Sequence, residues 1–299
     1  MKPPLFSIII PTYARPKPLS ACLESLAHLD YPRDRFEVIV VDDGSEVPLQ
    51  PVVSAFQSRF NLTLLKQANA GPATARNTGA AQAQGEFLAF TDDDCTPAAD
   101  WLQALAARVA ASPDCMIGGR TLNALPDNPY STASQWLIDY LYTYYNADPH
   151  QACFFTSNNL AIPAAHFRAL GGFDTTYPHA AAEDREFCDR WRYYGYRLVY
   201  APEVVVYHAH ALTLRTFWRQ HFHYGGGAFR FHQTRARRGA GRIRLESPSF
   251  YMNLLRYPFS QAQGRQALLV AALLVLSQGA NAVGFLWERL RQTYRLNHR

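Results

Sequence analysis

Glu86-Phe87-Leu88-Ala89-Phe90-Thr91-Asp92-Asp93-Asp94 runs from an apolar segment directly into three consecutive carboxylates. Residues 86–90 predict a buried strand that ends at this acidic triplet. Adjacent carboxylates raise one another's pKa, so a positive group has to neutralise them. A divalent cation is a natural partner, because Mg²⁺ and Mn²⁺ prefer hard oxygen ligands. A solvated acidic turn that precedes the next helix is the alternative interpretation.

Outward from the triplet, short apolar runs alternate with helical segments. The pattern predicts strands at 6–10, 36–41, 63–65 and 86–90, and helices at about 18–29, 52–60 and 73–83. This alternation predicts an α/β fold with a mostly parallel sheet and helices on both faces. In such sheets ligands bind at the carboxyl ends of the strands. Three polar segments fall there: Thr12, Asp42 to Ser45, and Asp92 to Asp94.

The pattern changes in the second half of the chain. It predicts a helix at 101–112, a strand at 153–162, a helix at 183–194 and a strand at 204–208. An aromatic stretch from Trp136 to Tyr145 lies between the first two of these. At helical spacing such residues belong to a core more often than to a stacking surface for a sugar or lipid.

Composition and charge narrow the class of protein. With 48% hydrophobic and 18% charged residues, the chain is not disordered. The net charge is +5, but residues 215–299 contain fourteen arginines and only two acids, Glu246 and Glu288. Such a segment suits an anionic membrane surface, a nucleic acid or a phosphate-bearing ligand. The five cysteines include no C-x-x-C pair, which indicates neither a disulfide framework nor a zinc site and fits a reducing cytosol.

Residues 267–287 form an uncharged stretch near the C-terminus. As a helix it would reach about 30 Å, which is enough to span a bilayer. Ser277, Gln278 and Asn281 share one helical face, which weakens the interpretation as a spanning helix. A helix that lies in the membrane interface and a helix that packs on the rest of the protein are the two other interpretations. Flanking arginines such as Arg265 and Arg289 favour a helix at the cytoplasmic face over one that crosses.

Four motifs taken in order resemble the inverting glycosyltransferases of family 2. These are Ser7-Ile8-Ile9-Ile10-Pro11-Thr12-Tyr13, Val40-Val41-Asp42-Asp43-Gly44-Ser45, Gly71-Pro72-Ala73-Thr74-Ala75-Arg76-Asn77-Thr78-Gly79 and Phe90-Thr91-Asp92-Asp93-Asp94. Gly171-Gly172-Phe173-Asp174, with Glu183, Asp184, Arg190 and Gly195, extends the resemblance to about His208. It implies a GT-A fold, a Rossmann-like α/β domain at 1–212. Residues 1–100 would then be the nucleotide-sugar half, 101–212 the acceptor half, and 213–299 a basic, helical, membrane-associated extension.

The resemblance also implies roles for individual residues. The nucleotide donor would contact Pro11, Thr12, Tyr13, Arg15, Asp42, Asp43, Arg76, Asn77, Asp92 and Asp93. Asp94 would be the direct ligand of Mn²⁺ or Mg²⁺, with Asp92 and His208 as further candidates. Asp184 would be the general base and Glu183 its neighbour or a ligand of the acceptor hydroxyl. Each has a structural alternative: Asp-Gly is an ordinary turn, and acids at a helix N-terminus suit the helix dipole.

The expected activity is metal-assisted transfer of a sugar to a hydroxyl of a glycan or lipid-linked acceptor. The donor is a nucleotide-diphospho-sugar, with UDP favoured, and an inverting displacement needs a single base. We expect a cytoplasmic protein associated with an anionic membrane surface, and no nucleic-acid partner. A sugar nucleotidyltransferase would need a Gly-rich, Lys- or Arg-bearing loop at 11–18, which the chain lacks. A non-catalytic nucleotide-sugar-binding protein or membrane scaffold stays open.

Overall fold

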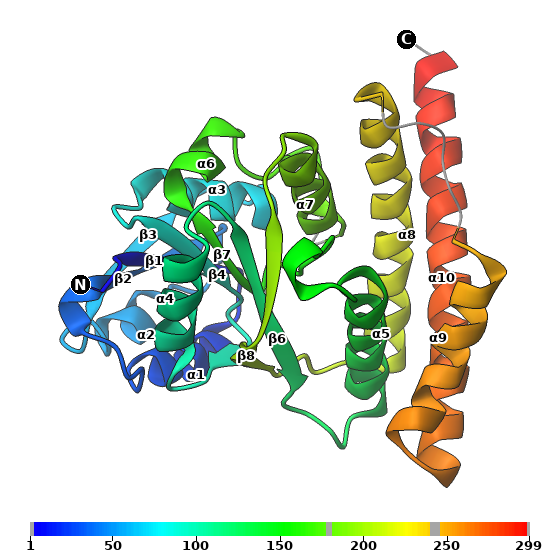
Figure 1. The fold of residues 1–299 in the computed structure, drawn as a ribbon, viewed down its shortest axis with the longest axis horizontal. Helices are drawn as coiled ribbons and strands as arrows, with labels where there is room; N and C mark the ends of the chain where they lie inside the picture. Colours follow the sequence, from blue (N-terminus) through cyan, green and yellow to red (C-terminus); the bar gives the residue numbers. More distant parts are fainter. Residues whose placement is uncertain (1–2, 178–180, 240–245, 298–299) are drawn as a thin grey trace.

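The computed structural model describes residues 3–177, 181–239 and 246–297. Within them the strands form an eight-stranded sheet in the order β3-β2-β1-β4-β7-β6-β8-β5 (Figure 1). The bounds are β1 Phe6–Thr12, β2 Phe36–Asp42, β3 Asn61–Lys66, β4 Phe87–Thr91, β5 Cys95–Pro97, β6 Met116–Asn123, β7 Asn159–Pro163 and β8 Leu198–His208. The α/β fold class predicted from the sequence is confirmed.

The first four strands are parallel, as predicted. β1 pairs with β2 and with β4, and β2 pairs with β3. Thr12 and Asp42 are register partners at the carboxyl ends of β1 and β2, and Thr91 ends β4 beside them. The predicted convergence of polar strand ends at one edge of the sheet is therefore present.

The second half of the sheet is mixed. β7 runs antiparallel to β4 and β6, β5 runs antiparallel to β8, and β6 runs parallel to β8. The predicted strand at 153–162 was wrong over 153–158, where side chains fix the backbone: the Tyr142 hydroxyl accepts from Thr156 N at 2.9 Å. The strand predicted at 204–208 begins earlier, at Leu198. A register shift between β6 and β8 accommodates the proline at 202.

Helices cover both faces of the sheet. One face carries α1 (Pro16–Leu26), α2 (Gln50–Ser54) and α4 (Trp101–Ala111), and the other carries α3 (Pro72–Gln82), α6 (Ala164–Ala169) and α7 (Glu183–Tyr193). Strand alternation explains this, because Ile8 and Ile10 enter one core and Ile9 the other. The helix predicted at 52–60 was too long. The chain turns after Ser54, and Phe56 and Phe60 stack together in the core.

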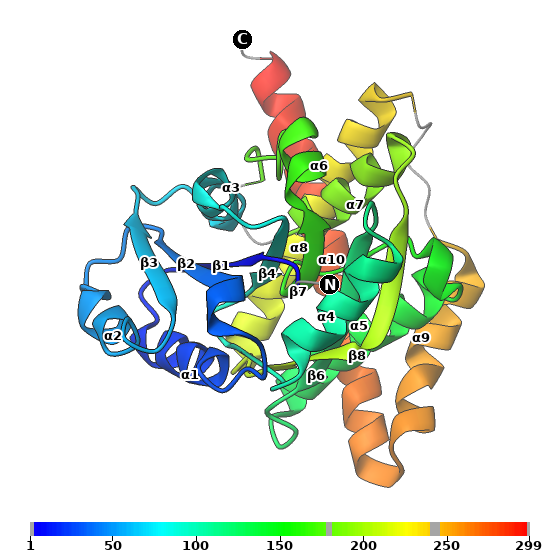
Figure 2. The ribbon, with the colours of Figure 1, turned by 60° about the vertical axis from the view of Figure 1, so that its left-hand side comes forward.

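Four helices form a layer beside the sheet: α5 (Pro129–Tyr145), α8 (Leu214–Arg237), α9 (Pro248–Gln261) and α10 (Gly264–Asn297). In Figures 1 and 2, α8 and α10 lie side by side and α9 packs against α10. Phe217, Leu254 and Leu274 lie in their shared apolar core. A Cβ added at Gly225 would lie 2.0 Å from the Asn281 carbonyl oxygen, so α8 and α10 approach closely at this glycine.

Residues 264–294 of α10 are long and apolar enough to cross a membrane by length and composition, and an 18-residue window within them has a mean hydropathy of 1.8. The helix packs on α8 and α9, and it also leaves apolar side chains exposed. We call these the outer face of α10: Leu268, Leu269, Val275, Val283, Leu286, Trp287 and Leu290. Residues 240–245 and 298–299 of the predicted basic extension lie outside the described residues.

Candidate functional site

The acidic triplet lies against the carboxyl end of β1. The Thr12 hydroxyl donates to Asp93 at 2.7 Å, and the Arg15 guanidinium pairs with Asp93 at 2.7 Å and with Asp94 at 2.6 Å. Burial raises the pKa of Asp93 to about 7 despite the charge of Arg15. Arg15 thus supplies the positive charge that the triplet requires.

Asp94 is also held by the end of β8. β5 and β8 pair with Cys95 opposite His208, and Ala209 N donates to the Asp94 carbonyl at 2.8 Å. His208 Nε2 lies 3.2 Å from Asp94 Oδ1. Burial opposes ionisation of Asp94, but the hydrogen bond and charge of His208, with the charge of Arg15, hold its pKa well below the usual range.

These groups fit a divalent cation. Ligand atoms of Asp94, Cys95 and His208 lie within 4.8 Å of one another. Burial raises the pKa of the Cys95 thiol well above its ordinary value, so the thiol stays protonated and is a poor ligand. A carboxylate oxygen and an imidazole nitrogen remain, and this donor set suits Mn²⁺ or Mg²⁺ completed by phosphate oxygens and water.

Arg76 on α3 links the triplet to α7. Its buried guanidinium lies 2.7 Å from Asp92 and 3.1 Å from Glu183, and it lies over the ring of Phe173. Its Nε is buried without a hydrogen-bond partner in the described structure. Glu183 is therefore already engaged in a buried ion pair, which leaves its neighbour as the carboxylate available for chemistry.

That neighbour, Asp184, lies in the first turn of α7. It accepts a hydrogen bond from Arg185 N at 2.7 Å, and in the described part of the chain it forms no ion pair. Burial, and then the negative charge of Glu183, raise the pKa of Asp184 to about 7. A carboxyl whose pKa lies near neutrality is suited to accept a proton from a hydroxyl.

One cavity of about 1270 Å³ joins these groups, and we call it the site cavity. Its wall includes these residues predicted from the sequence: Pro11, Thr12, Tyr13, Arg15, Asp43, Arg76, Asp92, Asp93, Asp94, Glu183, Asp184 and His208. The sheet edge supplies one end of the wall and the helical layer supplies the other.

Two predicted donor contacts, Asp42 and Asn77, do not line the site cavity. Asp42 is buried and accepts from Ser45 N at 2.9 Å, so it closes the turn after β2. Asn77 donates to the Phe173 carbonyl at 2.8 Å and accepts from Phe173 N at 2.9 Å. Both polar groups hold backbone in place in this structure, and their contact with a donor stays a prediction.

Asp43 has a double role. It lines the cavity and accepts from Ala70 N and Gly71 N, each at 2.9 Å. These bonds hold the loop that leads into α3.

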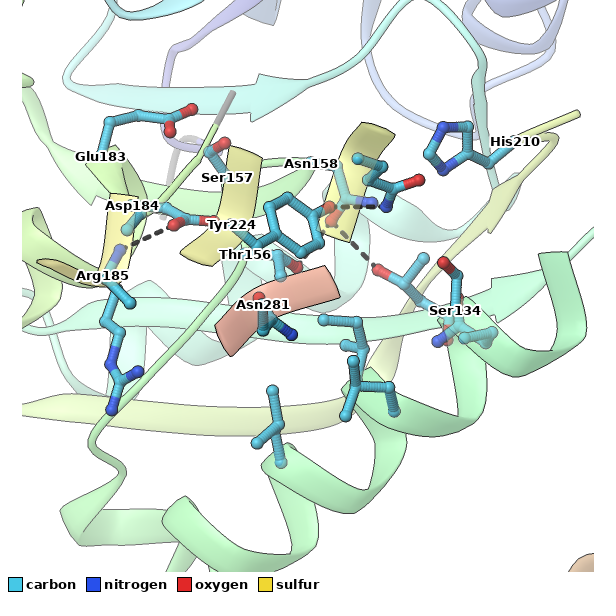
Figure 3. A pocket seen from close by; sticks show the side chains of 18 of the residues that line it. Ser134, Thr156, Ser157, Asn158, Glu183, Asp184, Arg185, His210, Tyr224 and Asn281 are labelled. Carbon is cyan, nitrogen blue, oxygen red and sulfur yellow. Dashed lines mark hydrogen bonds between the residues drawn. The ribbon is translucent and has the colours of Figure 1, made fainter. Parts of the chain in front are cut away.

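Sequence reasoning missed the far wall of the cavity. Figure 3 shows polar side chains there from several elements: Ser134, Thr156, Ser157, Asn158, His210, Tyr224 and Asn281. Of the aromatic stretch, Tyr145 reaches the wall, whereas Tyr140 and Tyr142 are buried. No motif marks the missed residues, because α5, α8 and α10 and the segments before β7 and after β8 come together only in the folded protein.

Comparisons with known proteins agree with this geometry. The model of the family described as "Glycosyl transferase family 2" matches residues 7–171. Glycosyltransferase AglE of Haloferax volcanii is 32% identical over 42% of this chain and 41% of its own length. Validoxylamine A glucosyltransferase of Streptomyces hygroscopicus subsp. jinggangensis is 28% identical over 71% of this chain and 53% of its own. The chain thus spans about half, or less, of the length of these curated relatives.

Solved structures share the fold. The mannosyltransferase PcManGT from Pyrobaculum calidifontis, in complex with GDP-Man and Mn²⁺, superposes with a TM-score of 0.67 at 20% identity, over 96% of this chain and 88% of that one. S. aureus TarS 1-349 in complex with UDP-GlcNAc gives 0.56 at 19% identity, over 98% and 92%. Together with the GT-A arrangement of the strand ends, the family match leads to one conclusion: the chain belongs to glycosyl transferase family 2.

Proposed function

We propose that the protein transfers a sugar from a nucleotide-diphospho-sugar to a hydroxyl of a glycan or lipid-linked acceptor, with inversion and with Asp184 as general base. The observation that carries this proposal is the placement of Asp184 on the wall that also holds the acidic triplet. A proton acceptor and an acidic, cation-binding end in one cavity match the needs of a single displacement from a metal-bound diphosphate.

Asp184 would take the proton as the acceptor oxygen attacks the anomeric carbon. The bond from that carbon to the diphosphate oxygen breaks, and the nucleoside diphosphate leaves with the bonding electrons. Glu183 and Arg76 act as positioning residues, since their ion pair fixes the start of α7. The carboxyl of Asp184, which forms no ion pair in the described part of the chain, then faces the cavity.

The strand ends would hold the donor. Pro11, Thr12 and Tyr13 supply the wall for the nucleoside, and the unpartnered Nε of Arg76 is suited to a phosphate oxygen. Asp94 and His208, with Asp92, would hold Mn²⁺ or Mg²⁺, which when bound stabilises charge on the departing diphosphate. UDP is the favoured nucleotide; solved relatives with UDP-GlcNAc and with GDP-Man support both as donors to test.

We further propose that the catalytic domain occupies residues 1–212 and that the extension at 213–299 associates with the cytoplasmic face of a membrane. The exposed outer face of α10 and the arginines that flank it support this location. A membrane scaffold that binds nucleotide-sugars without turnover is the alternative. The paired arrangement of Asp184 and the acidic triplet favours the enzyme.

The test is donor binding and turnover by the full chain. UDP- and GDP-sugars are titrated by calorimetry with and without Mn²⁺, and release of nucleoside diphosphate is followed with acceptor extracts. Asp94→Ala should abolish metal-dependent binding. Asp184→Asn should retain binding and lose about 10²- to 10⁴-fold in transfer.

Asp139→Asn is the matched control. Burial raises the pKa of Asp139 to about 6, yet this residue lies outside the cavity wall. Its replacement should leave transfer unchanged. Donor binding without any turnover by the native chain would favour the scaffold, and equal activity in Asp184→Asn would remove the base assignment.

A further inference from the structure

The part of the site cavity that α5, α9 and α10 line beyond Asp184 is largely apolar, although Arg185 and Glu246 also belong to the cavity wall. Leu137, Ile138 and Leu141 line it from α5, Phe250 and Leu254 from α9, and Ala282, Phe285 and Leu286 from α10. The residues that α9 and α10 contribute to the wall carry no charge. A wall of this kind excludes a long, fully polar glycan, because its hydroxyl groups would lose water without gaining hydrogen bonds.

A polar band separates this apolar end from the acidic triplet. Thr156, Asn158 and Tyr224 lie in it near Asp184, and Asn281 faces them from α10 (Figure 3). The Thr156 hydroxyl donates to Asn158 Oδ1 at 2.8 Å. Hydroxyl and amide groups recognise a hydroxyl-bearing head. Glu183 is already paired with Arg76, so Asp184 is the carboxylate that would disfavour an anionic head beside it.

The cavity exceeds the needs of a donor alone. Pockets for small molecules are commonly about 300–1,000 Å³, and this cavity is about 1270 Å³. Its apolar end reaches the surface at Tyr251 and Leu286, which are 37% and 54% exposed. Leu286 also belongs to the outer face of α10, so the mouth of the cavity continues into an exposed apolar surface.

We infer that the acceptor is an amphiphile: its neutral hydroxyl-bearing head binds beside Asp184, and its alkyl-type tail occupies the apolar end between α5, α9 and α10. The inference rests on the proposed function and names its substrate class. The tail emerges at Leu286, where the outer face of α10 would meet a lipid layer.

The experiment measures binding of alkyl β-D-glucosides to the full chain. Butyl, octyl and dodecyl glucosides, and free glucose, are titrated by calorimetry below their micelle-forming concentrations. Burial of each additional CH₂ group should tighten binding by about fourfold. Octyl glucoside has four more CH₂ groups than butyl glucoside and should therefore bind on the order of 10²-fold more tightly. Affinity that does not depend on tail length would overturn the inference.

Matched variants locate the tail. Ala282→Trp fills the apolar end, and Leu286→Gln makes its mouth polar; both should remove most of the tail-length dependence. Ala272→Trp and Leu290→Gln change exposed positions of the same helix outside the cavity wall. Both of these variants should keep the dependence of binding on tail length. A tail-length dependence that survives Ala282→Trp would mean that tails bind the outer face instead, and would also overturn the inference.

Donor binding distinguishes a failure of the amphiphilic acceptor from a failure of the proposed function. Metal-dependent binding of a nucleotide-sugar is measured for the same proteins. Intact donor binding without a tail effect would count against the amphiphilic acceptor alone. If the native chain binds no nucleotide-sugar, that result would count against the proposed function itself.

Discussion

His208 Nε2 lies 3.2 Å from Asp94 Oδ1, so the end of β8 faces the acidic triplet at the end of β4. His208→Ala removes the nitrogen from the proposed cation site. We expect the affinity of a nucleoside diphosphate measured with Mn²⁺ to fall by at least about tenfold, with little change in metal-free binding. His28→Ala alters an exposed histidine and is the control. Equal affinity in both variants would exclude His208 as a ligand.

The rate of transfer should depend on the ionisation of Asp184. A base must be deprotonated, and the pKa of Asp184 is raised to about 7 by burial and by Glu183. We therefore expect kcat/KM to fall as pH drops through about 7. Arg76 and Glu183 are the charged groups packed against it on this side. Glu183→Gln removes a negative charge and should lower the pKa of Asp184, so the fall in kcat/KM should move to lower pH. A pH profile that does not move would contradict the assignment of Asp184 as the base.

The buried cation Arg76 should be important for folding. Arg76→Met leaves Asp92 and Glu183 without their shared partner, and loss of one side of a buried pair costs about 3–5 kcal/mol. Urea unfolding measures the loss. Arg108→Met breaks an exposed pair with Glu203 and should cost less than about 1 kcal/mol. The double variant Arg76→Met/Glu183→Gln should recover part of the stability, and no recovery would contradict the ion-pair explanation.

Close contact between α8 and α10 requires glycine. A Cβ at Gly284 would lie 1.9 Å from the Phe222 carbonyl oxygen, whereas one at Gly279 of the same helix meets nothing within 4 Å. We expect Gly284→Ala to destabilise the protein by about 1–3 kcal/mol and to increase hydrogen exchange in α10. Gly279→Ala should be neutral or stabilise by up to about 1 kcal/mol. The same response in both variants would argue against a tight crossing.

Association with lipid should depend on the outer face of α10. Co-sedimentation of the full chain with phosphatidylcholine vesicles containing phosphatidylglycerol should weaken in Trp287→Ser and at high salt. Tyr193→Ser is the control, since Tyr193 is similarly exposed at 58% but lies on α7. If Trp287→Ser binds vesicles as strongly as the native chain, the outer face of α10 does not mediate the association with lipid.

The strand-end part of the cavity wall could be predicted from sequence because its residues follow strands. A buried apolar run identifies each strand, and parallel pairing brings Thr12 and Asp92 to one edge. Hydrogen-bond partners could not be predicted this way. Asn77 and Asp42 have the right position in the motif, but their side chains are engaged with backbone of Phe173 and Ser45.

The start and direction of β7 and the packing of the helical layer were beyond local patterns. β7 is only five residues long, and residues 153–158 before it have strand-like composition while being held as a loop by Tyr142 and Asn146. Tyr224 and Asn281 reach the cavity only because α8 and α10 cross at small residues. Neither residue belongs to a sequence motif, so their place depends on tertiary packing.

Helices α8, α9 and α10 of the helical layer lie beyond the part of the chain that the family model matches. The family match ends at residue 171, and α8 begins at Leu214. Every wall residue from α8, α9 and α10 therefore lies outside the matched region. We therefore expect substitutions in these helices to alter the binding of the proposed acceptor while the arrangement of the strand ends stays intact. Under the proposed function, acceptor choice and donor binding could then be varied separately, because different elements supply the two ends of the cavity.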